Sequence, residues 1–274
     1  MELLEPGLGL RLGQGPAARG EWLCFIDADT VARPAMLKDC LSYCLGRDVE
    51  FLSLIPAEAA VSFSERVFLP SIFMIIAASM DFRRVNDPAD PYALANGQFM
   101  LFKRSAYEGL GGHGAVAGEI MEDIALARLA KKAGIRYRWV FGEKVVETRM
   151  YRGLSDIWHG FSKNMSEIMR GRDAGVCVVM ALKSFTLGWG SVVLPLAFWG
   201  LGSQDPAGAM AFWMCAAASA ALFLAQAATV LDLQVPVGYA VFLPAGFTLH
   251  AAITLNSCLN AGQRRWKDRV YGSS

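Results

Sequence analysis

The sequence predicts an α/β domain followed by an α-helical membrane region. A strand, a helix and a second strand are expected at residues 22–26, 34–46 and 49–55, an order typical of parallel α/β units. After residue 175 come three apolar blocks, each near or above the roughly 20 residues that span a bilayer. The chain is 54% hydrophobic with a mean hydropathy of +0.33, which is high for a purely soluble protein of 274 residues.

The first strand is a continuous apolar run, Trp22–Ile26, that ends at Asp27 and Asp29. Such a run suits a strand buried on both faces of a parallel sheet, and open α/β sheets bind ligands at the carboxyl edge. Two carboxylates at this spacing supply hard oxygen ligands, so they favour a divalent cation, Mg²⁺ or Mn²⁺, that carries phosphate oxygens. The alternative interpretation is an ordinary polar turn, which aspartate also favours.

A second acidic site, Glu122 and Asp123, begins a helix expected over residues 122–134. Acids in a first turn favour the helix dipole, and this explanation suffices for the pair alone. The pair follows a glycine-rich loop at residues 109–118, which can close over a substrate or be a simple connection. A carboxylate at a helix start beside a cleft is well placed to accept a proton. His113 in the loop is a candidate contact for a phosphate or an acceptor, or simply a solvated side chain.

Residues 149–164 combine cations with aromatic side chains. Arg152 or Lys163 can hold a diphosphate there, while Trp158 can stack on a sugar ring. The same segment can be an interfacial helix whose basic side chains reach the polar surface of a bilayer. Both interpretations hold together if an active site faces the membrane surface.

Composition excludes one class of partner and bears on the compartment. The formal net charge of +1 argues against a nucleic-acid partner, which needs a strongly basic domain or stripe. The six cysteines are scattered without a C-x-x-C pair, so we expect them to be reduced packing residues on the cytosolic side. The first 20 residues lack the apolar core of a secretory signal.

The three apolar blocks are expected at residues 176–201, 207–231 and 235–259. The last of them contains His250 and Asn256. Polar groups at membrane depth face protein or a cavity, so these two side chains can line a groove for a lipid acceptor. A hydrogen bond between helices is the simpler use of the same side chains.

Charge predicts the topology of the membrane region. The basic tail at residues 264–269 is expected in the cytoplasm by the positive-inside tendency. If the α/β domain is also cytoplasmic, the number of crossings is even. The first block contains Lys183 and Pro195, so it is expected to be interfacial or re-entrant, while the other two blocks form a hairpin through residues 232–234. The predicted domains are residues 1–165, 166–262 and 263–274.

Four short motifs follow one another in a recognisable order. They are Asp27-Ala28-Asp29, Asn96-Gly97-Gln98, Glu122-Asp123, and Met150-Tyr151-Arg152 followed by residues 158–164. This order resembles the family 2 glycosyltransferases, in particular membrane members that glycosylate lipids, such as the hopanoid-associated, carotenoid and ceramide-type enzymes. The resemblance implies a partial GT-A domain with a Rossmann-like mixed sheet, followed by the membrane helices.

The resemblance also implies roles for single residues. Asp29 would be the metal ligand, with Asp27 as its partner towards the nucleotide. Asp123 would be the base that deprotonates the acceptor hydroxyl, with Glu122 beside it. The residues expected to contact the nucleotide-sugar donor are Gln98, Arg152, Trp158 and Lys163. The implied partners are this donor, a lipid acceptor and the cell membrane, which the chain would cross more than once with its catalytic domain in the cytoplasm.

The resemblance implies a nucleotide-binding half ahead of the Asp-x-Asp strand. Only about 20 residues precede that strand here, less than one βαβ unit of roughly 30 residues. A separate chain that supplies this half is one expectation, and a truncated, inactive membrane protein is another. The family's Gln/Arg-x-x-Arg-Trp motif is absent, which favours transfer of a single sugar over polymer synthesis. A haloacid-dehalogenase-type phosphatase is a further alternative, because residues 27–31 match its D-x-D-x-T/V motif, although its Gly-Asp-x-x-x-Asp cluster has no counterpart.

Overall fold

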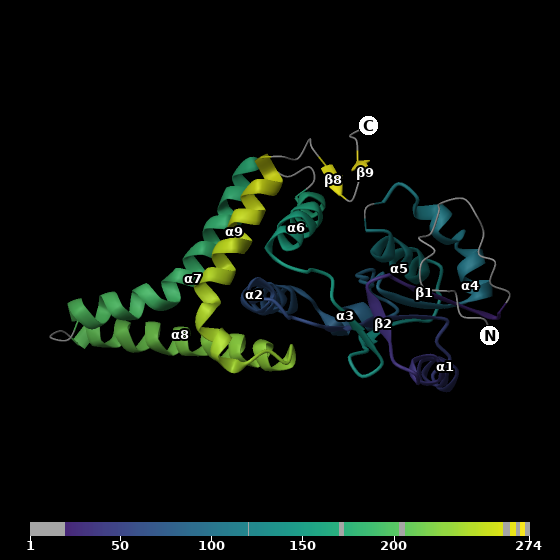
Figure 1. Cartoon of the computed structure of the whole chain (residues 1–274), viewed down its shortest axis with the longest axis horizontal. Coiled ribbons are helices and arrows are strands. Elements are labelled where there is room, and N and C mark those ends of the chain that lie inside the picture. Colours follow the sequence, from purple (N-terminus) through teal and green to yellow (C-terminus); the bar gives the residue numbers. More distant parts are fainter. Residues whose placement is uncertain are drawn as a thin grey trace. The chain divides into compact units, whose positions relative to one another are not determined.

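The computed structural model describes residues 20–119, 121–169, 173–202, 206–259, 264–266 and 269–271. Its helices and strands form two compact units (Figure 1). The first unit consists of residues 1–59 and 81–150 and contains the two larger sheets. The second unit consists of residues 60–80 and 151–274 and is mostly helical. The predicted order of an α/β part followed by apolar helices is confirmed.

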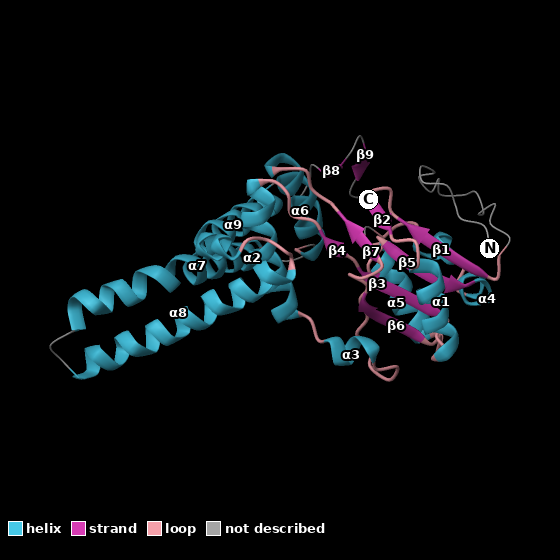
Figure 2. Cartoon of the chain, turned by 60° about the horizontal axis from the view of Figure 1, so that its bottom comes forward, coloured by secondary structure: helices cyan, strands magenta, loops and turns pink. Residues whose placement is uncertain are grey.

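The main sheet of the first unit is mixed (Figure 2). Its four strands, in spatial order, are β1 (Trp22–Ile26), β5 (Phe99–Lys103), β3 (Phe51–Ile55) and β6 (Tyr137–Phe141). β5 pairs antiparallel with both β1 and β3, whereas β3 pairs parallel with β6. β1 and β3 therefore run in the same direction, as the strand-helix-strand order predicts, but β5 lies between them.

The expected place of the first strand inside a parallel sheet is wrong. β1 is antiparallel to its neighbour and lies at one end of the strand order. Leu23 and Phe25 are buried, while Trp22 and Cys24 are only half-buried. The strands buried on both faces are β3 and β5, in each of which the first four residues are buried. An apolar run records burial but not the direction of the neighbouring strand, which a segment some 75 residues later decides.

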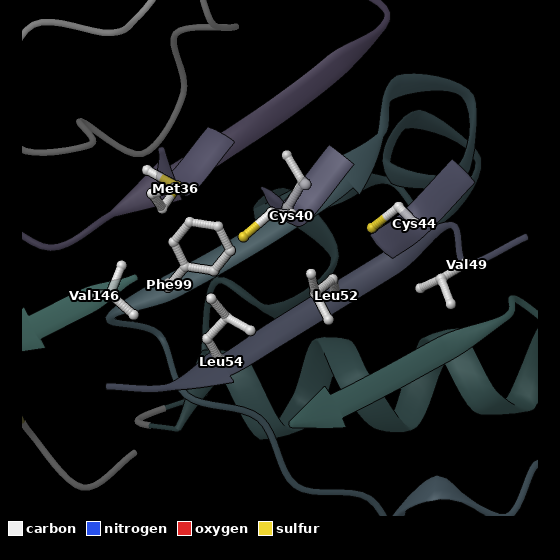
Figure 3. Packing of buried hydrophobic residues seen from close by; sticks show 9 residues of the cluster. Met36, Cys40, Cys44, Val49, Leu52, Leu54, Phe99 and Val146 are labelled. Carbon is white, nitrogen blue, oxygen red and sulfur yellow. The ribbon is translucent and has the colours of Figure 1, made fainter. Parts of the chain in front are cut away.

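A hydrophobic core lies between helix α1 (Met36–Gly46) and one face of the main sheet (Figure 3). Met36, Cys40 and Cys44 recur every four residues and form the buried stripe of the helix. They pack against strand residues of the same cluster, which include Leu52, Leu54, Phe99, Leu101 and Val146. The expected helix is thus confirmed, although it begins at Met36 rather than at Pro34.

Aromatic rings fill the other face of the main sheet. Side chains alternate along a strand, so Phe51 and Phe102 point away from α1. Their rings stack with centroids 3.7 Å apart, and Tyr107 of α4 (Arg104–Gly109) meets Phe102 edge-on at 5.4 Å. Helix α5 (Glu122–Lys132), which confirms the helix expected there, buries a stripe of small and aliphatic residues: Leu126, Ala127 and Ala130.

The first unit also contains a three-stranded sheet, which includes the strand that follows β1 in the chain. Its order is β2 (Thr30–Ala32), β7 (Val146–Thr148) and β4 (Ala57–Glu58). β7 pairs antiparallel with β2 and parallel with β4. Two short helices, α3 (Phe82–Asn86) and η1 (Gly112–Val116), complete the unit. Since β2 follows β1 after three residues, the two aspartates lie where the chain passes from one sheet to the other.

The second unit is built from helices and one short hairpin. They are α2 (Phe63–Ser79), α6 (Leu154–Ile168), α7 (Ala174–Gly202), α8 (Pro206–Asp232), η2 (Val237–Phe242), α9 (Leu243–Leu259), β8 (Arg264–Trp266) and β9 (Arg269–Tyr271). Among the described residues, three segments are long and apolar enough to cross a membrane: Ala174–Trp199, Pro206–Asp232 and Val237–Leu259. The number of crossings, their direction and the domain boundaries at residues 165 and 262 stay predictions.

The helix pairing differs from the expected hairpin. α7 lies beside α9 along its first half and beside α8 along its second half (Figure 1). α8 and α9 do not pack along each other, because η2 separates them. α7 also runs as one helix through Pro195, without the break that a re-entrant segment needs. The expectation that the second and third blocks pair as a hairpin is therefore wrong, and α7 is the common partner.

Two cysteines also depart from expectation. Cys177 of α7 and Cys258 of α9, 81 positions apart, form a disulfide, so the prediction that all six cysteines are reduced is wrong. No short motif marks this pair because only the packing of α7 on α9 brings it together. The free cysteines are Cys24, Cys40, Cys44 and Cys215. Burial raises the pKa of the Cys40 thiol to about 12, which agrees with a packing role there.

Candidate functional site

The Asp27-Ala28-Asp29 segment forms the turn between β1 and β2. The amide of Thr30 donates to the carbonyl oxygen of Asp27 at 3.0 Å and closes the turn. The Asp27 side chain is exposed, and Asp29 is half-buried. The polar-turn interpretation thus describes the backbone correctly, and it leaves the use of the two carboxylates open.

The Asn96-Gly97-Gln98 segment lies at the same end of the main sheet as these aspartates. It precedes β5, and antiparallel pairing sets the start of β5 beside the end of β1, with Phe99 opposite Ile26. The amide of Asp27 donates to the carbonyl oxygen of Gln98 at 3.4 Å. Two motifs separated by about 70 residues in the sequence are therefore in backbone contact.

Asp123, the second residue of α5, is bound to this same turn. Its Oδ2 atom accepts a hydrogen bond from the Gly97 amide at 2.9 Å, and its Oδ1 atom accepts one from the Ile124 amide at 2.8 Å. Burial raises the pKa of the Asp123 carboxyl above its ordinary value, while the two amides act in the opposite direction. The charge of the exposed Glu122 raises this pKa further. Such a carboxylate takes up a proton more readily than an ordinary aspartate.

A chain of hydrogen bonds connects Gln98 with Asp29. The Gln98 side chain is buried and donates from Nε2 to Oγ1 of Thr148 at 3.3 Å. The Thr148 hydroxyl in turn donates to the carbonyl oxygen of Asp29 at 3.2 Å. Gln98, which was expected to contact a donor, thus holds the backbone of Asp29 in place through the Thr148 hydroxyl.

Two positioning residues were missed in the sequence. Thr148 is one of them, and Ser53 of β3 is the other. The Ser53 hydroxyl accepts from the Asn96 amide at 2.8 Å and lies 3.2 Å from the Asn96 carbonyl oxygen, to which it donates. The available signal was a single polar side chain inside a buried apolar strand, which needs a hydrogen-bond partner.

The carboxylates fit a divalent cation in one respect. The Oδ1 atom of Asp29 is buried and has no hydrogen-bond partner in the described part of the chain. A buried carboxylate oxygen without a partner costs free energy that a cation would offset. No group of three or more histidines, cysteines or acids in the described residues could hold a metal alone. A cation held by these two carboxylates would need further ligands from outside the described residues.

His113 is more firmly held than a loop histidine was expected to be. Its Nδ1 atom lies 2.8 Å from the Tyr107 hydroxyl, and its ring contacts Phe25 with centroids 4.9 Å apart. Burial lowers the pKa of His113, and the charge of Glu122 partly compensates. Gly112 sits at φ +56°, and a Cβ there would lie 2.6 Å from the Tyr107 ring. Gly112 thus permits the close approach of the Tyr107 ring, whose hydroxyl is hydrogen-bonded to His113.

The basic and aromatic residues expected to contact the donor belong to the second unit. Arg152 is exposed just before α6, and its amide donates to Oδ2 of Asp156 at 3.1 Å. Trp158 and Lys163 are half-buried on α6. The first unit brings together four predicted residues, Asp27, Asp29, Gln98 and Asp123. The roles of Arg152, Trp158 and Lys163 stay predictions.

Residues 11–174 match the family model described as "Glycosyltransferase like family 2". This match covers more than half of the chain and contains all four of the sequence motifs. No curated protein matches the chain significantly.

Proposed function

Because the chain belongs to the glycosyltransferase-like family 2, we propose that it transfers a single sugar from a nucleotide-sugar donor to the hydroxyl group of a membrane lipid. The three apolar helices support a membrane-bound reaction. The acids of the first unit support direct displacement assisted by a divalent cation.

One observation carries the proposal. The Asn96-Gly97-Gln98 turn is hydrogen-bonded on one side to Asp123 and on the other to Asp27. The proposed proton acceptor and the proposed cation ligands are therefore hydrogen-bonded to the same backbone turn. A transfer reaction needs these two functions close together, because the acceptor oxygen and the leaving diphosphate oxygen are attached in turn to the same carbon.

Asp123 is the proposed base. The proton of the acceptor hydroxyl moves to the Asp123 carboxylate while the acceptor oxygen forms a bond to the anomeric carbon of the sugar. The bond from that carbon to the diphosphate oxygen breaks, and its electron pair leaves with the diphosphate. The amides of Gly97 and Ile124 each occupy one lone pair of the carboxylate, so further lone pairs remain for the proton.

Asp29 and Asp27 are the proposed cation ligands. They would hold a Mg²⁺ or Mn²⁺, whose charge would stabilise the departing diphosphate. The role of this chain is to orient the ligands, since Thr148 and Gln98 hold the Asp29 backbone while its Oδ1 atom has no hydrogen-bond partner among the described residues. We propose that Arg152, Trp158 and Lys163 contact the nucleotide-sugar donor.

The proposal is tested by replacing Asp123 with asparagine. Membranes containing the full chain are incubated with UDP-glucose, UDP-N-acetylglucosamine or GDP-mannose, each radiolabelled in the sugar, and label in the lipid extract is counted. Asp123→Asn keeps the shape but removes the base, so transfer should fall about 10²–10⁴-fold. Asp39→Asn is the matched control, because Asp39 is an exposed acid in the first turn of α1.

The pH profile gives an independent readout. A base acts only when ionised, so transfer by the parent should decrease as the pH falls through the raised pKa of Asp123. Asp123→Asn should lose this limb of the profile, and Asp39→Asn should keep it. Equal rates for Asp123→Asn and the parent would refute the base assignment. A parent that labels no lipid from any of the three donors would favour the inactive alternative.

A further inference from the structure

Helix α8 and the second half of α7 form a hairpin within the second unit. In two views they extend together away from α2, α6 and α9 (Figure 1 and Figure 2). α7 has no charged side chain from residue 184 to residue 202, and α8 has none from residue 206 to residue 231. Each stretch is close to or above the roughly 20 residues that cross bilayer hydrocarbon. The hairpin is therefore long enough to cross a membrane and return.

Helix α9 is packed differently from α8. In its most apolar stretch 50% is buried inside the protein, whereas the corresponding stretch of α8 is only 11% buried. α9 contacts α2, α6 and α7, and it buries polar side chains. One of them is His250, whose Nδ1 atom lies 2.8 Å from the Ser184 hydroxyl of α7, so the expected hydrogen bond between helices is present. The surface left for lipid thus belongs mainly to α8, which exposes Met210, Trp213 and Leu224.

The start of α9 is tied to the first unit through α2. The first segment of that unit ends at Ala59, which is hydrogen-bonded to β7. Ser62, the N-cap of α2, follows three residues later, and three residues reach at most about 11 Å. The ring of Phe63 then contacts Tyr239 and Phe242 of η2, with centroids 5.9 and 5.3 Å apart. η2 leads directly into α9.

The end of α9 is tied to the same unit through α6. Met150 is the last residue of the first unit, and Tyr151 follows it directly. The Tyr151 ring contacts the Phe161 ring of α6 with centroids 4.9 Å apart. The next residue, Ser162, accepts a hydrogen bond at its carbonyl oxygen from the Ser257 hydroxyl of α9 at 3.0 Å. Short connections therefore lead from the paired strands β4 and β7 to both ends of α9.

A helix that crossed the bilayer could not satisfy both of these ties. Its ends would lie on opposite sides of about 30 Å of hydrocarbon. The first unit has open sheet edges, so it stays outside the hydrocarbon on one side. The far end of α9 would then be out of reach of a short connection to that unit. The same reasoning applies to α2, because the first unit holds the chain both before it, at Ala59, and after it, at Asp81.

We propose that, of the helices that the structure describes, only α7 and α8 cross the membrane, and that α9 lies with α2 and α6 in the lipid head-group layer on the side of the first unit. Polar side chains occur where this layer meets the hairpin. Gln226 of α8 donates to the Ser71 hydroxyl of α2 at 3.1 Å. Lys183 of α7 precedes the uncharged stretch, and its long side chain extends to the head groups.

The test labels single cysteines with a membrane-impermeant maleimide in sealed vesicles of right-side-out and inside-out orientation that contain the full chain. The background carries Cys24→Ser and Cys215→Ser, because these two free cysteines are partly exposed. Val237→Cys and Leu259→Cys place a thiol at each end of the apolar α9 segment. Ala207→Cys places one at the start of α8. All three positions are exposed.

The two α9 positions should react in the same vesicle orientation, and Ala207→Cys should react in the opposite one. Reaction of Val237→Cys and Leu259→Cys in opposite orientations would overturn the proposal, because α9 would then cross the bilayer. Reaction of all three in one orientation would also overturn it, because the hairpin would not cross. An α9 position that reacts only after detergent is added would do the same. None of these results depends on sugar transfer.

A matched pair of substitutions tests membrane depth without cysteines. Met214 of α8 and Ala245 of α9 are both exposed, and each lies eight residues after the first residue of its apolar segment. Met214→Lys places a charge in hydrocarbon, so the amount of chain that resists carbonate extraction from membranes should fall several-fold. Ala245→Lys places the charge among head groups and should leave that amount unchanged. Equal effects of the two substitutions would overturn the proposal.

Discussion

The two units of this chain satisfy their polar groups in different ways. In the first unit, the important acid is held by backbone amides of a nearby turn, as Gly97 and Ile124 hold Asp123. In the second unit, polar side chains pair with one another across helices, as Ser184 does with His250 and Gln226 with Ser71. The amide arrangement leaves carboxylate lone pairs available for chemistry. The side-chain pairs hold helices together, and one of them leaves the buried Oε1 atom of Gln226 without a hydrogen-bond partner among the described residues.

In the first unit, we expect the largest loss of sugar transfer on removal of the Asp29 carboxylate, whose Oδ1 atom has no hydrogen-bond partner among the described residues. Asp29→Asn keeps the turn and its bond from Thr148, because that bond goes to the backbone. It removes the proposed cation ligand, so transfer should fall about 10²–10³-fold, comparable to loss of one key electrostatic contact. Radiolabel transfer measured against Mn²⁺ concentration tests this. An unchanged rate with an unchanged Mn²⁺ requirement would show that Asp29 binds no cation.

In the second unit, we expect the largest loss of stability when the Cys177–Cys258 disulfide is removed. Reduction of the Cys177–Cys258 disulfide, or the double variant Cys177→Ala with Cys258→Ala, should lower the free energy of unfolding by about 2–4 kcal/mol. Thermal unfolding of the purified chain in detergent, with and without reductant, measures the effect. Cys215→Ala is the control because Cys215 is a free cysteine on α8. Identical melting curves for the oxidised and reduced chain would contradict the link.

A smaller effect is expected where helices approach closely. A Cβ on Gly246 of α9 would overlap Oγ of Ser71 and would lie 2.8 Å from the carbonyl oxygen of Val67, both in α2. Gly246→Ala must therefore separate α2 from α9, at a cost of about 1–3 kcal/mol in unfolding free energy. Gly238→Ala, with open space around it, should change stability little. Equal melting temperatures for the two variants would show that the approach of α2 to α9 contributes nothing.

Much of the first unit could be predicted because its signals are local. The apolar run ending at Asp27 and the helix beginning at Glu122 are both found where they were expected. The strand neighbours could not be predicted in the same way. Pairing of β1 with β5 depends on residues far along the chain, and burial of an apolar run is the same for either strand direction. The roles of Ser53 and Thr148 could not be predicted, because each is a common strand residue whose hydrogen-bond partner lies far away in the sequence.

The membrane helices follow the same rule. Their length and composition are visible in the sequence, so the three segments were located correctly. The sequence did not predict which helices pack together, because an apolar helix surface offers no pattern that selects one neighbour over another. The pairing of α7 with both α8 and α9, and with it the disulfide, depends on close packing at particular residues such as Gly188, which approaches Phe247.

The sequence by itself determined which side chains are available for chemistry and which segments are apolar enough to enter a membrane. Residue type and local spacing are sufficient for both. Only the tertiary structure decided that the Asn96-Gly97-Gln98 turn joins Asp27 to Asp123, and that Ser184 of α7 pairs with His250 of α9. The physical reason is that hydrogen bonds and cavities arise between residues tens of positions apart. Their geometry is set by packing, which no local pattern encodes.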